Sequence, residues 1–128
     1  MVEIHLFKHS TTWRTLVPGE VLFREGDPGD VMYGVIDGHI ELTCGDRVID
    51  DIGGSSIVGE MALVDAGPRS ATAIAKVESR VVPVDQRQFM FLVQEHPTFA
   101  LNVMKLMAER IRRGNLGGVT QPGAPPPS

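Results

Sequence analysis

The sequence has little cysteine and no surplus of positive charge. Cys44 is the one cysteine in 128 residues, which excludes an internal disulfide and any zinc site built from several cysteines. Lys and Arg number 12 against 16 Asp and Glu, and the formal net charge is −4. Because phosphate contacts need a surplus of basic residues on one face, this balance argues against a nucleic-acid partner.

Long apolar runs are also missing from the chain. No apolar stretch approaches the roughly 18 residues that span a bilayer, so neither a membrane helix nor a membrane partner is predicted. The N-terminus, Met1–His5, lacks a basic region followed by an apolar core, which argues against a secretory signal. The chain is therefore expected in the cytoplasm, and its length is that of one domain.

Short apolar runs are plentiful between Thr15 and Asp85, where turns rich in Gly, Pro and Asp interrupt them. This rhythm is typical of an all-β sandwich or barrel. Strands are predicted at Glu20–Arg24, Val31–Ile36, His39–Cys44, Arg47–Ile52, Ser70–Ala75 and Arg80–Asp85.

After Asp85 the apolar spacing becomes helical. Phe89, Leu92 and Val93 mark a first helix, and Pro97 suits the first turn of a second, where its missing N–H is not needed. The second helix carries an apolar stripe that is expected to pack against the barrel, consisting of Phe99, Val103, Leu106, Met107 and Ile111.

Basic residues gather toward the end of this second helix, where cations favour the helix dipole. They are Lys105, Arg110, Arg112 and Arg113, and they are interpreted as helix termination rather than DNA contact. Gly114 is a natural stop. The expected organisation is an N-terminal segment over residues 1–15, a domain over 16–113 and a disordered Gly/Pro-rich tail over 114–128.

The segment Gly59–Thr72, GEMALVDAGPRSAT, carries the chemistry. Gly59 lets the backbone approach a ligand, and Met61–Val64 could form one helical turn whose N–H groups point at an anion. Arg69 offers forked donors to phosphate oxygens. A carboxylate at Glu60 would repel phosphate, so it needs another partner, such as a sugar hydroxyl beside the phosphate. An anion with a hydroxyl next to it describes a ribose cyclic phosphate.

The pattern Gly-Glu-x-Ala-Leu followed by Pro-Arg-Ser-Ala-Thr resembles the phosphate-binding cassette of the cyclic nucleotide-binding domains. Catabolite activator proteins, kinase regulatory subunits and cyclic nucleotide-gated channels contain such domains. The match extends upstream through Gly19–Asp30, Met32, Tyr33 and Gly38, and it covers about Leu16 to Arg113. The resemblance implies a mainly β fold, an antiparallel β-roll (a jelly-roll-like barrel) with flanking α-helices at its C-terminal end.

The same resemblance implies roles for individual residues. Glu60 would bind the ribose 2′-hydroxyl and Arg69 the exocyclic phosphate oxygens. Gly59 and Ala62 would offer backbone amides, and Ser70 its amide or hydroxyl. The remaining candidates are Thr72, facing the pocket or the core, and three apolar walls for ribose and base, Met61, Ile49 and Val58.

Two departures from the family pattern concern the loop before the cassette and the base cap. The sequence Gly53-Gly54-Ser55-Ser56 carries its glycine earlier than the family does. The last helix breaks at Gly114-Asn115, where family members cap the base, so Arg110, Ile111 or Arg113 are the candidates to cap it. This break also removes the long dimerisation helix of catabolite activator proteins, which disfavours a transcription factor.

The functional expectation is a stand-alone sensor that binds cAMP or cGMP, with a slight preference for cAMP, and needs no cofactor. It would signal by moving its C-terminal helix, to an effector protein in trans. The alternative is a degenerate β-roll interaction module that binds no nucleotide, in which Glu60 and Arg69 form an internal ion pair.

An enzyme is not expected. A cupin-type metal site needs closely spaced ligands, and the four histidines are scattered at His5, His9, His39 and His96. Asp50 and Asp51 fall on one short strand and face opposite sides, so they cannot form a catalytic carboxylate pair.

Overall fold

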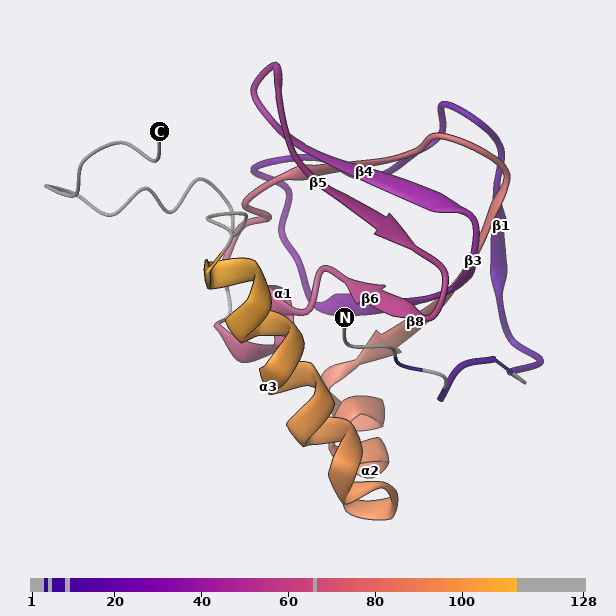
Figure 1. The fold of residues 1–128 in the computed structure, drawn as a ribbon, viewed down its shortest axis with the longest axis vertical. Coiled ribbons are helices and arrows are strands. Elements are labelled where there is room, and N and C mark those ends of the chain that lie inside the picture. Colours follow the sequence, from indigo (N-terminus) through magenta and orange to yellow (C-terminus); the bar gives the residue numbers. More distant parts are fainter. Residues whose placement is uncertain (1–3, 5, 9, 66, 113–128) are drawn as a thin grey trace, which may run out of the picture.

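The computed structural model describes residues 4, 6–8, 10–65 and 67–112, and their strands form two four-stranded sheets that make a roll (Figure 1). In the first sheet the order is β1 (Arg14–Leu16), β8 (Ser79–Asp85), β3 (Val31–Asp37) and β6 (Ser56–Val58). In the second it is β2 (Val21–Phe23), β7 (Thr72–Ala75), β4 (His39–Cys44) and β5 (Arg47–Gly53). The pairings are antiparallel, which confirms the predicted β-roll.

All six strands predicted from the sequence are present, with small shifts at their ends. The strand predicted from Ser70 begins at Thr72, for example, and the strand predicted to end at Ile52 continues to Gly53. The sequence missed β1 and β6, which are three residues long. Three residues are too few to show the alternation of apolar and polar residues that identifies longer strands, and β2, which is equally short, was predicted from the turns on either side of it.

Two apolar clusters form the core. One lies between the two sheets and contains Leu16, Leu22, Val35, Ile40, Ile52, Val58, Ala73, Ala75 and Val81. The other joins the first sheet to the helices and contains Ile4, Phe7, Met32, Ile57, Val82, Val84, Phe99, Val103 and Leu106. Ile57 and Val58 are neighbours in β6 yet belong to different clusters, because successive side chains of a strand point to opposite faces.

In the described residues the helices are α1 (Met61–Val64), α2 (Gln86–Glu95) and α3 (Pro97–Arg112). Asp85 starts α2 with a capping box: Gln88 N donates to Asp85 Oδ1 at 2.8 Å, and Asp85 N donates to Gln88 Oε1 at 2.9 Å. Pro97 begins α3, as predicted. From there α3 runs back from the end of α2 toward α1 (Figure 1).

The buried stripe of α3 differs from the prediction at its C-terminal end. Phe99, Val103 and Leu106 are buried as expected, but Ile111 is 58% exposed and Arg110 is only 2% exposed. The spacing explains the error. Arg110 follows Leu106 by four residues and stays on the same face, whereas Ile111 is rotated by about 100° away from it.

The described part of the N-terminal segment packs on the domain. Ile4 and Phe7 are buried, Ile4 N donates to Ser55 O at 2.7 Å, and the rings of Phe7 and Phe99 meet edge to face at 6.1 Å. The tail over 114–128 and the candidate Arg113 lie outside the described residues. Among the residues that are described, no helix is long and apolar enough to cross a membrane.

Candidate functional site

A cavity of about 230 Å³ opens beside α1, between the cassette loop and the second sheet. Seven of the predicted site residues line it: Ile49, Gly59, Glu60, Met61, Ala62, Arg69 and Ser70. The remaining lining residues are Phe23, Leu42, Asp65, Gly67, Pro68, Ala71 and Arg110. The predicted site residues therefore make up half of the cavity lining.

Two predicted site residues do not line this cavity. Val58 is fully buried in the cluster between the sheets, because β6 directs it there and Ile57 to the other face. The hydroxyl of Thr72 accepts a hydrogen bond from Glu25 N at 2.9 Å, so Thr72 joins β7 to the turn after β2.

Phe23 and Leu42 are apolar walls that sequence reasoning missed. Both are register partners of Ala73, one on β2 and one on β4, so the sheet brings them to either side of β7. The pairing shifts between Val21 and Phe23, and such irregularities re-aim side chains. No local pattern reveals a register between distant strands, so the sequence held no signal for this pair.

Arg69 lies at one end of the cavity and is held by backbone carbonyls. Its Nη2 donates to Val31 O at 2.7 Å and its Nη1 to Gly59 O at 3.3 Å. The guanidinium carbon sits 4.2 Å from the centroid of the Phe23 ring, a cation–π contact. Its Nε is a buried donor without a hydrogen-bond partner among the described residues.

The environment of Arg69 is partly apolar. Burial lowers the pKa of its guanidinium from the ordinary value, and nearby groups such as Tyr33, Asp30 and Asp27 oppose the shift. Arginine titrates so far above neutral pH that the side chain stays charged. The cavity therefore has a fixed cation at this end.

Gly59 makes the close approach of Arg69 possible. Its φ is +78°, a left-handed conformation that other residues adopt at a cost. A Cβ at this position would lie 2.8 Å from Arg69 Nη1 and 3.2 Å from the Phe23 ring. The glycine is thus required both by its dihedral angle and by the arginine beside it.

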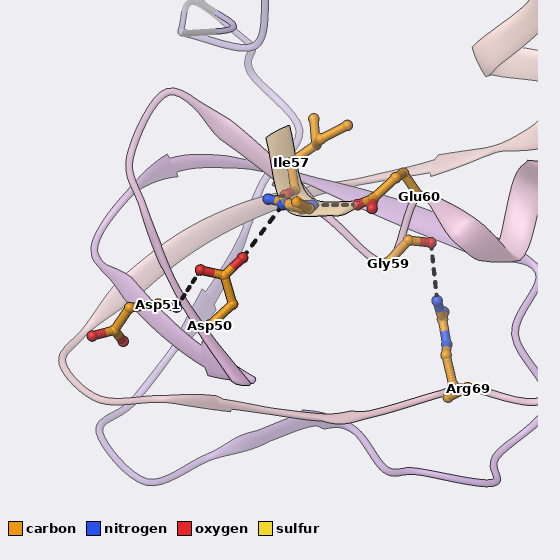
Figure 2. A network of polar contacts seen from close by, with 7 residues as sticks. Asp50, Asp51, Ile57, Gly59, Glu60 and Arg69 are labelled. Atoms are coloured by element: carbon orange, nitrogen blue, oxygen red, sulfur yellow. Dashed lines mark hydrogen bonds and ion pairs between the residues drawn. The ribbon is translucent and has the colours of Figure 1, made fainter. Parts of the chain in front are cut away.

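Glu60 is bound to Arg110 and not to Arg69. The carboxylate is 3% exposed, and Arg110 Nη1 donates to its Oε1 at 2.8 Å. Figure 2 shows the Glu60 carboxylate turned toward the guanidinium beside Ile57, while the Arg69 side chain points to Gly59 from the loop before β7. The expected alternative of an internal Glu60–Arg69 ion pair is therefore wrong in its choice of cation.

Arg110 lies in the last turn of α3, as predicted, but it is also buried at the site, which the interpretation as helix termination alone did not include. Its Nη2 donates to Ile57 O at 2.8 Å, and its Nε lies 3.5 Å from Asp50 Oδ2 (Figure 2). Of the candidate base caps, Arg110 lines the cavity, whereas Ile111 is exposed. Its signal in the sequence was the spacing of four from Leu106, which continues the buried stripe.

Asp50 and Asp51 face opposite sides of β5, as predicted. Asp50 is buried and faces Arg110, and its Oδ1 accepts a hydrogen bond from Asp51 N at 2.8 Å. The Asp51 side chain is exposed and lies 3.0 Å from His39 Nε2. No group of three potential ligands that could hold a metal occurs in the described part of the chain, from which His5 and His9 are excluded.

The short helix α1 forms at Met61–Val64, where the sequence predicted one helical turn. Ala62 N, one of the amides expected at a phosphate, donates to Gly59 O at 3.2 Å, which is long for such a bond. Ser70 is exposed at the edge of the cavity. The cavity thus combines a cation, a carboxylate and apolar walls, and it suits a small anion that carries a hydroxyl and an apolar group.

Comparisons with known proteins agree with this geometry. A family model described as a cyclic nucleotide-binding domain matches residues 13–96. The CRP-like cAMP-activated global transcriptional regulator of Mycobacterium tuberculosis is 31% identical over 104 residues, which cover 76% of this chain and 46% of that protein. The chain therefore spans about half the length of this curated relative.

Solved structures show the same fold. The crystal structure of the Thermus thermophilus catabolite activator protein has a TM-score of 0.73 at 29% identity, covering 82% of this chain and 52% of the other. The structure of cAMP-bound PfPKA-R has a TM-score of 0.72 at 25% identity, covering 86% and 38%. The match of the family model ends before α3, so Arg110 lies beyond it.

Proposed function

The chain belongs to the cyclic nucleotide-binding domain family, and we propose that it is a sensor domain whose cavity binds cAMP or cGMP. The observation that carries the proposal is that Arg69 and Glu60 line one cavity without being paired to each other. A cation and a carboxylate are thereby available to one ligand. A ribose cyclic phosphate has the matching anion and hydroxyl side by side.

At the phosphate end, Arg69 supplies the positive charge. Its place in the cavity lining supports this role, because a guanidinium offers charge-assisted hydrogen bonds to phosphate oxygens. The backbone carbonyls of Val31 and Gly59 hold the guanidinium in place before the ligand arrives. Little of the binding free energy is then spent on ordering this side chain.

At the ribose end, the carboxylate of Glu60 accepts a hydrogen bond from the 2′-hydroxyl. Its carboxylate is shared with Arg110, which enters from α3. A ligand hydroxyl that donates to Glu60 changes the contact that joins this helix to the cavity. We propose that the domain signals through α3 in this way, to an effector protein that reads the helix.

Direct titration tests this function. The full chain is titrated with fluorescent cAMP and cGMP, with 5′-AMP as a control that carries the same base and sugar but an uncyclised phosphate. We expect saturable binding of a cyclic nucleotide and weaker binding of 5′-AMP. No binding of either cyclic nucleotide near millimolar concentration would refute the proposal.

Amide hydrogen exchange over Pro97–Arg112 tests the signalling half separately. We expect saturation with nucleotide to change exchange in α3. Binding with unchanged exchange in this helix would leave a binding module whose signal does not pass through α3.

The second candidate is a β-roll interaction module that binds no nucleotide. One feature favours it: both terminal nitrogens of Arg69 already donate to carbonyls, and Glu60 already has a cation in Arg110. Such a module would fail the titration and still bind a protein partner. Catalysis and nucleic-acid binding are not part of either proposal, and a cytoplasmic location stays a prediction from the sequence.

A further inference from the structure

Three buried charged side chains meet on the α3 side of the cavity. Asp50, Glu60 and Arg110 are 9%, 3% and 2% exposed. Arg110 donates to Glu60 Oε1 and to Ile57 O, both at 2.8 Å, whereas its Nε lies 3.5 Å from Asp50 Oδ2. One guanidinium therefore serves two carboxylates, and its contact with Glu60 is the closer one.

The contact with Asp50 is an ion pair without a hydrogen bond. The Nε–H of Arg110 has no hydrogen-bond partner among the described residues, although it is buried. A buried donor without a partner is unfavourable. A short movement of the guanidinium toward Asp50 would therefore be stabilised by a new hydrogen bond from Arg110 Nε to Asp50. The same movement would lengthen the bond to Glu60. Both carboxylates are thus close enough to pair with the charge of Arg110.

We propose that Asp50 is a positioning residue that receives Arg110 when a ligand hydroxyl takes Glu60. This inference rests on the proposed function of the cavity. The hydroxyl donates its hydrogen bond to the Glu60 carboxylate, Arg110 moves toward Asp50, and its bond to Ile57 O keeps the guanidinium in the site. Helix α3 then stays joined to the roll, because Arg110 passes from the carboxylate of Glu60 to that of Asp50.

Charge pairing explains why Asp50 matters to the ligand. A buried guanidinium that loses its carboxylate is strongly unfavourable unless another takes its place. With Asp50 present, Glu60 can turn to the ribose while Arg110 stays paired. Without Asp50, the ligand hydroxyl has to compete with Arg110 for the one carboxylate that remains.

The test compares a cyclic nucleotide with its 2′-deoxy analogue. Kd is measured for cAMP, or for cGMP if that nucleotide binds more tightly, and for the matching 2′-deoxy compound. The Kd of the 2′-deoxy compound divided by the Kd of the parent nucleotide reports the contribution of the 2′-hydroxyl. We expect Asp50→Asn to lower this ratio about fivefold, the loss of roughly one hydrogen bond. A purely structural role would weaken both nucleotides alike.

Two variants serve as controls. Asp51→Asn removes the neighbouring carboxylate, which faces away from Arg110 and contacts His39, and should leave the ratio unchanged. Asp50→Glu keeps a carboxylate beside Arg110 and should restore most of the ratio. An Asp50→Asn ratio equal to that of Asp51→Asn would overturn the inference.

A second measurement uses the unaltered protein, so the inference stays testable if Asp50→Asn does not fold. The Arg110 Nε–H resonance is followed by NMR and assigned by its absence in Arg110→Lys. We expect cyclic nucleotide to shift this signal and to slow its exchange with water, and the 2′-deoxy analogue to do so much less. Identical signals with both nucleotides would overturn the inference. Failure of the unaltered protein to bind either compound would instead refute the proposed function.

Discussion

The two ends of the cavity are built differently. At the Arg69 end, the backbone carbonyls of Val31 on β3 and of Gly59 fix the cation, which lies in the loop before β7. At the Glu60 end, the carboxylate is held by the side chain of Arg110 from α3. The same guanidinium also faces a second carboxylate, Asp50 on β5. Under the proposed function, this difference means that affinity for the phosphate is set at the Arg69 end, by contacts with the backbone, while communication with α3 depends on the Glu60 end.

Removing Arg110 should have the largest effect. Arg110→Ala leaves Glu60 and Asp50 buried without their cation, and breaking such a pair costs about 3–5 kcal/mol of unfolding free energy. Urea unfolding measures the loss. Arg112→Ala removes an exposed guanidinium from the same helix and should change stability by less than about 0.5 kcal/mol. Equal losses in the two variants would mean that the buried network does not stabilise the domain.

Removing Arg69 should affect binding more than folding, which would separate the two ends. Arg69→Ala is expected to weaken cAMP and cGMP alike by about 2–4 kcal/mol, because a charge-assisted contact with phosphate is lost. Calorimetric titration measures the loss, and Arg24→Ala, an exposed arginine beside β2, is the control. The ratio between each nucleotide and its 2′-deoxy analogue should stay as in the unaltered protein. A change in that ratio would show that the two ends are not independent.

The same division separates what the sequence could predict from what it could not. The segment Gly59–Thr72 is continuous, so Gly59, Glu60 and Arg69 were predicted together from their residue types, and all three line the cavity. The Glu60 end needs Arg110, which is 50 residues away and was assigned to the helix terminus. Its burial depends on which face of α3 meets the roll, and counting apolar residues alone put Ile111 there instead.

The apolar wall shows the same limit for strands. Six of the eight strands in the described residues were predicted from alternation and turns, and this was enough for the fold. Phe23 and Leu42 lie on either side of β7 through a register that no local pattern contains. Local chemistry therefore predicted the elements and the cassette, whereas contacts between distant elements required the structure.

Gly59→Ala should have a smaller effect, and it tests how rigid the Arg69 end is. The positive φ alone is expected to cost about 1–2 kcal/mol of stability, measured by thermal unfolding. The new Cβ would also press on Arg69 Nη1, so nucleotide affinity should fall as well. Gly45→Ala is a matched control, because Gly45 also has a positive φ but no atom within 4 Å of the added Cβ. Equal nucleotide affinity in both variants would mean that Arg69 adapts to the pressure.

The pair of Asp37 and Arg80 should give the smallest effect, and it tests whether burial is what distinguishes Arg110. The guanidinium and carboxylate are the same chemical groups, but both side chains are substantially exposed. Hydrogen bonds from Arg80 hold the pKa of Asp37 below its ordinary value of about 4. A carboxyl group whose pKa is lowered by folding stabilises the folded state above its unfolded-state pKa, and this contribution is lost as the pH falls through the folded-state pKa. Asp37→Asn should therefore lower the melting temperature slightly at neutral pH, and the difference from the unaltered protein should disappear in acid and shrink in high salt. A loss of stability in Asp37→Asn as large as that in Arg110→Ala would mean that burial does not explain why the ion pairs of Arg110 stabilise the domain.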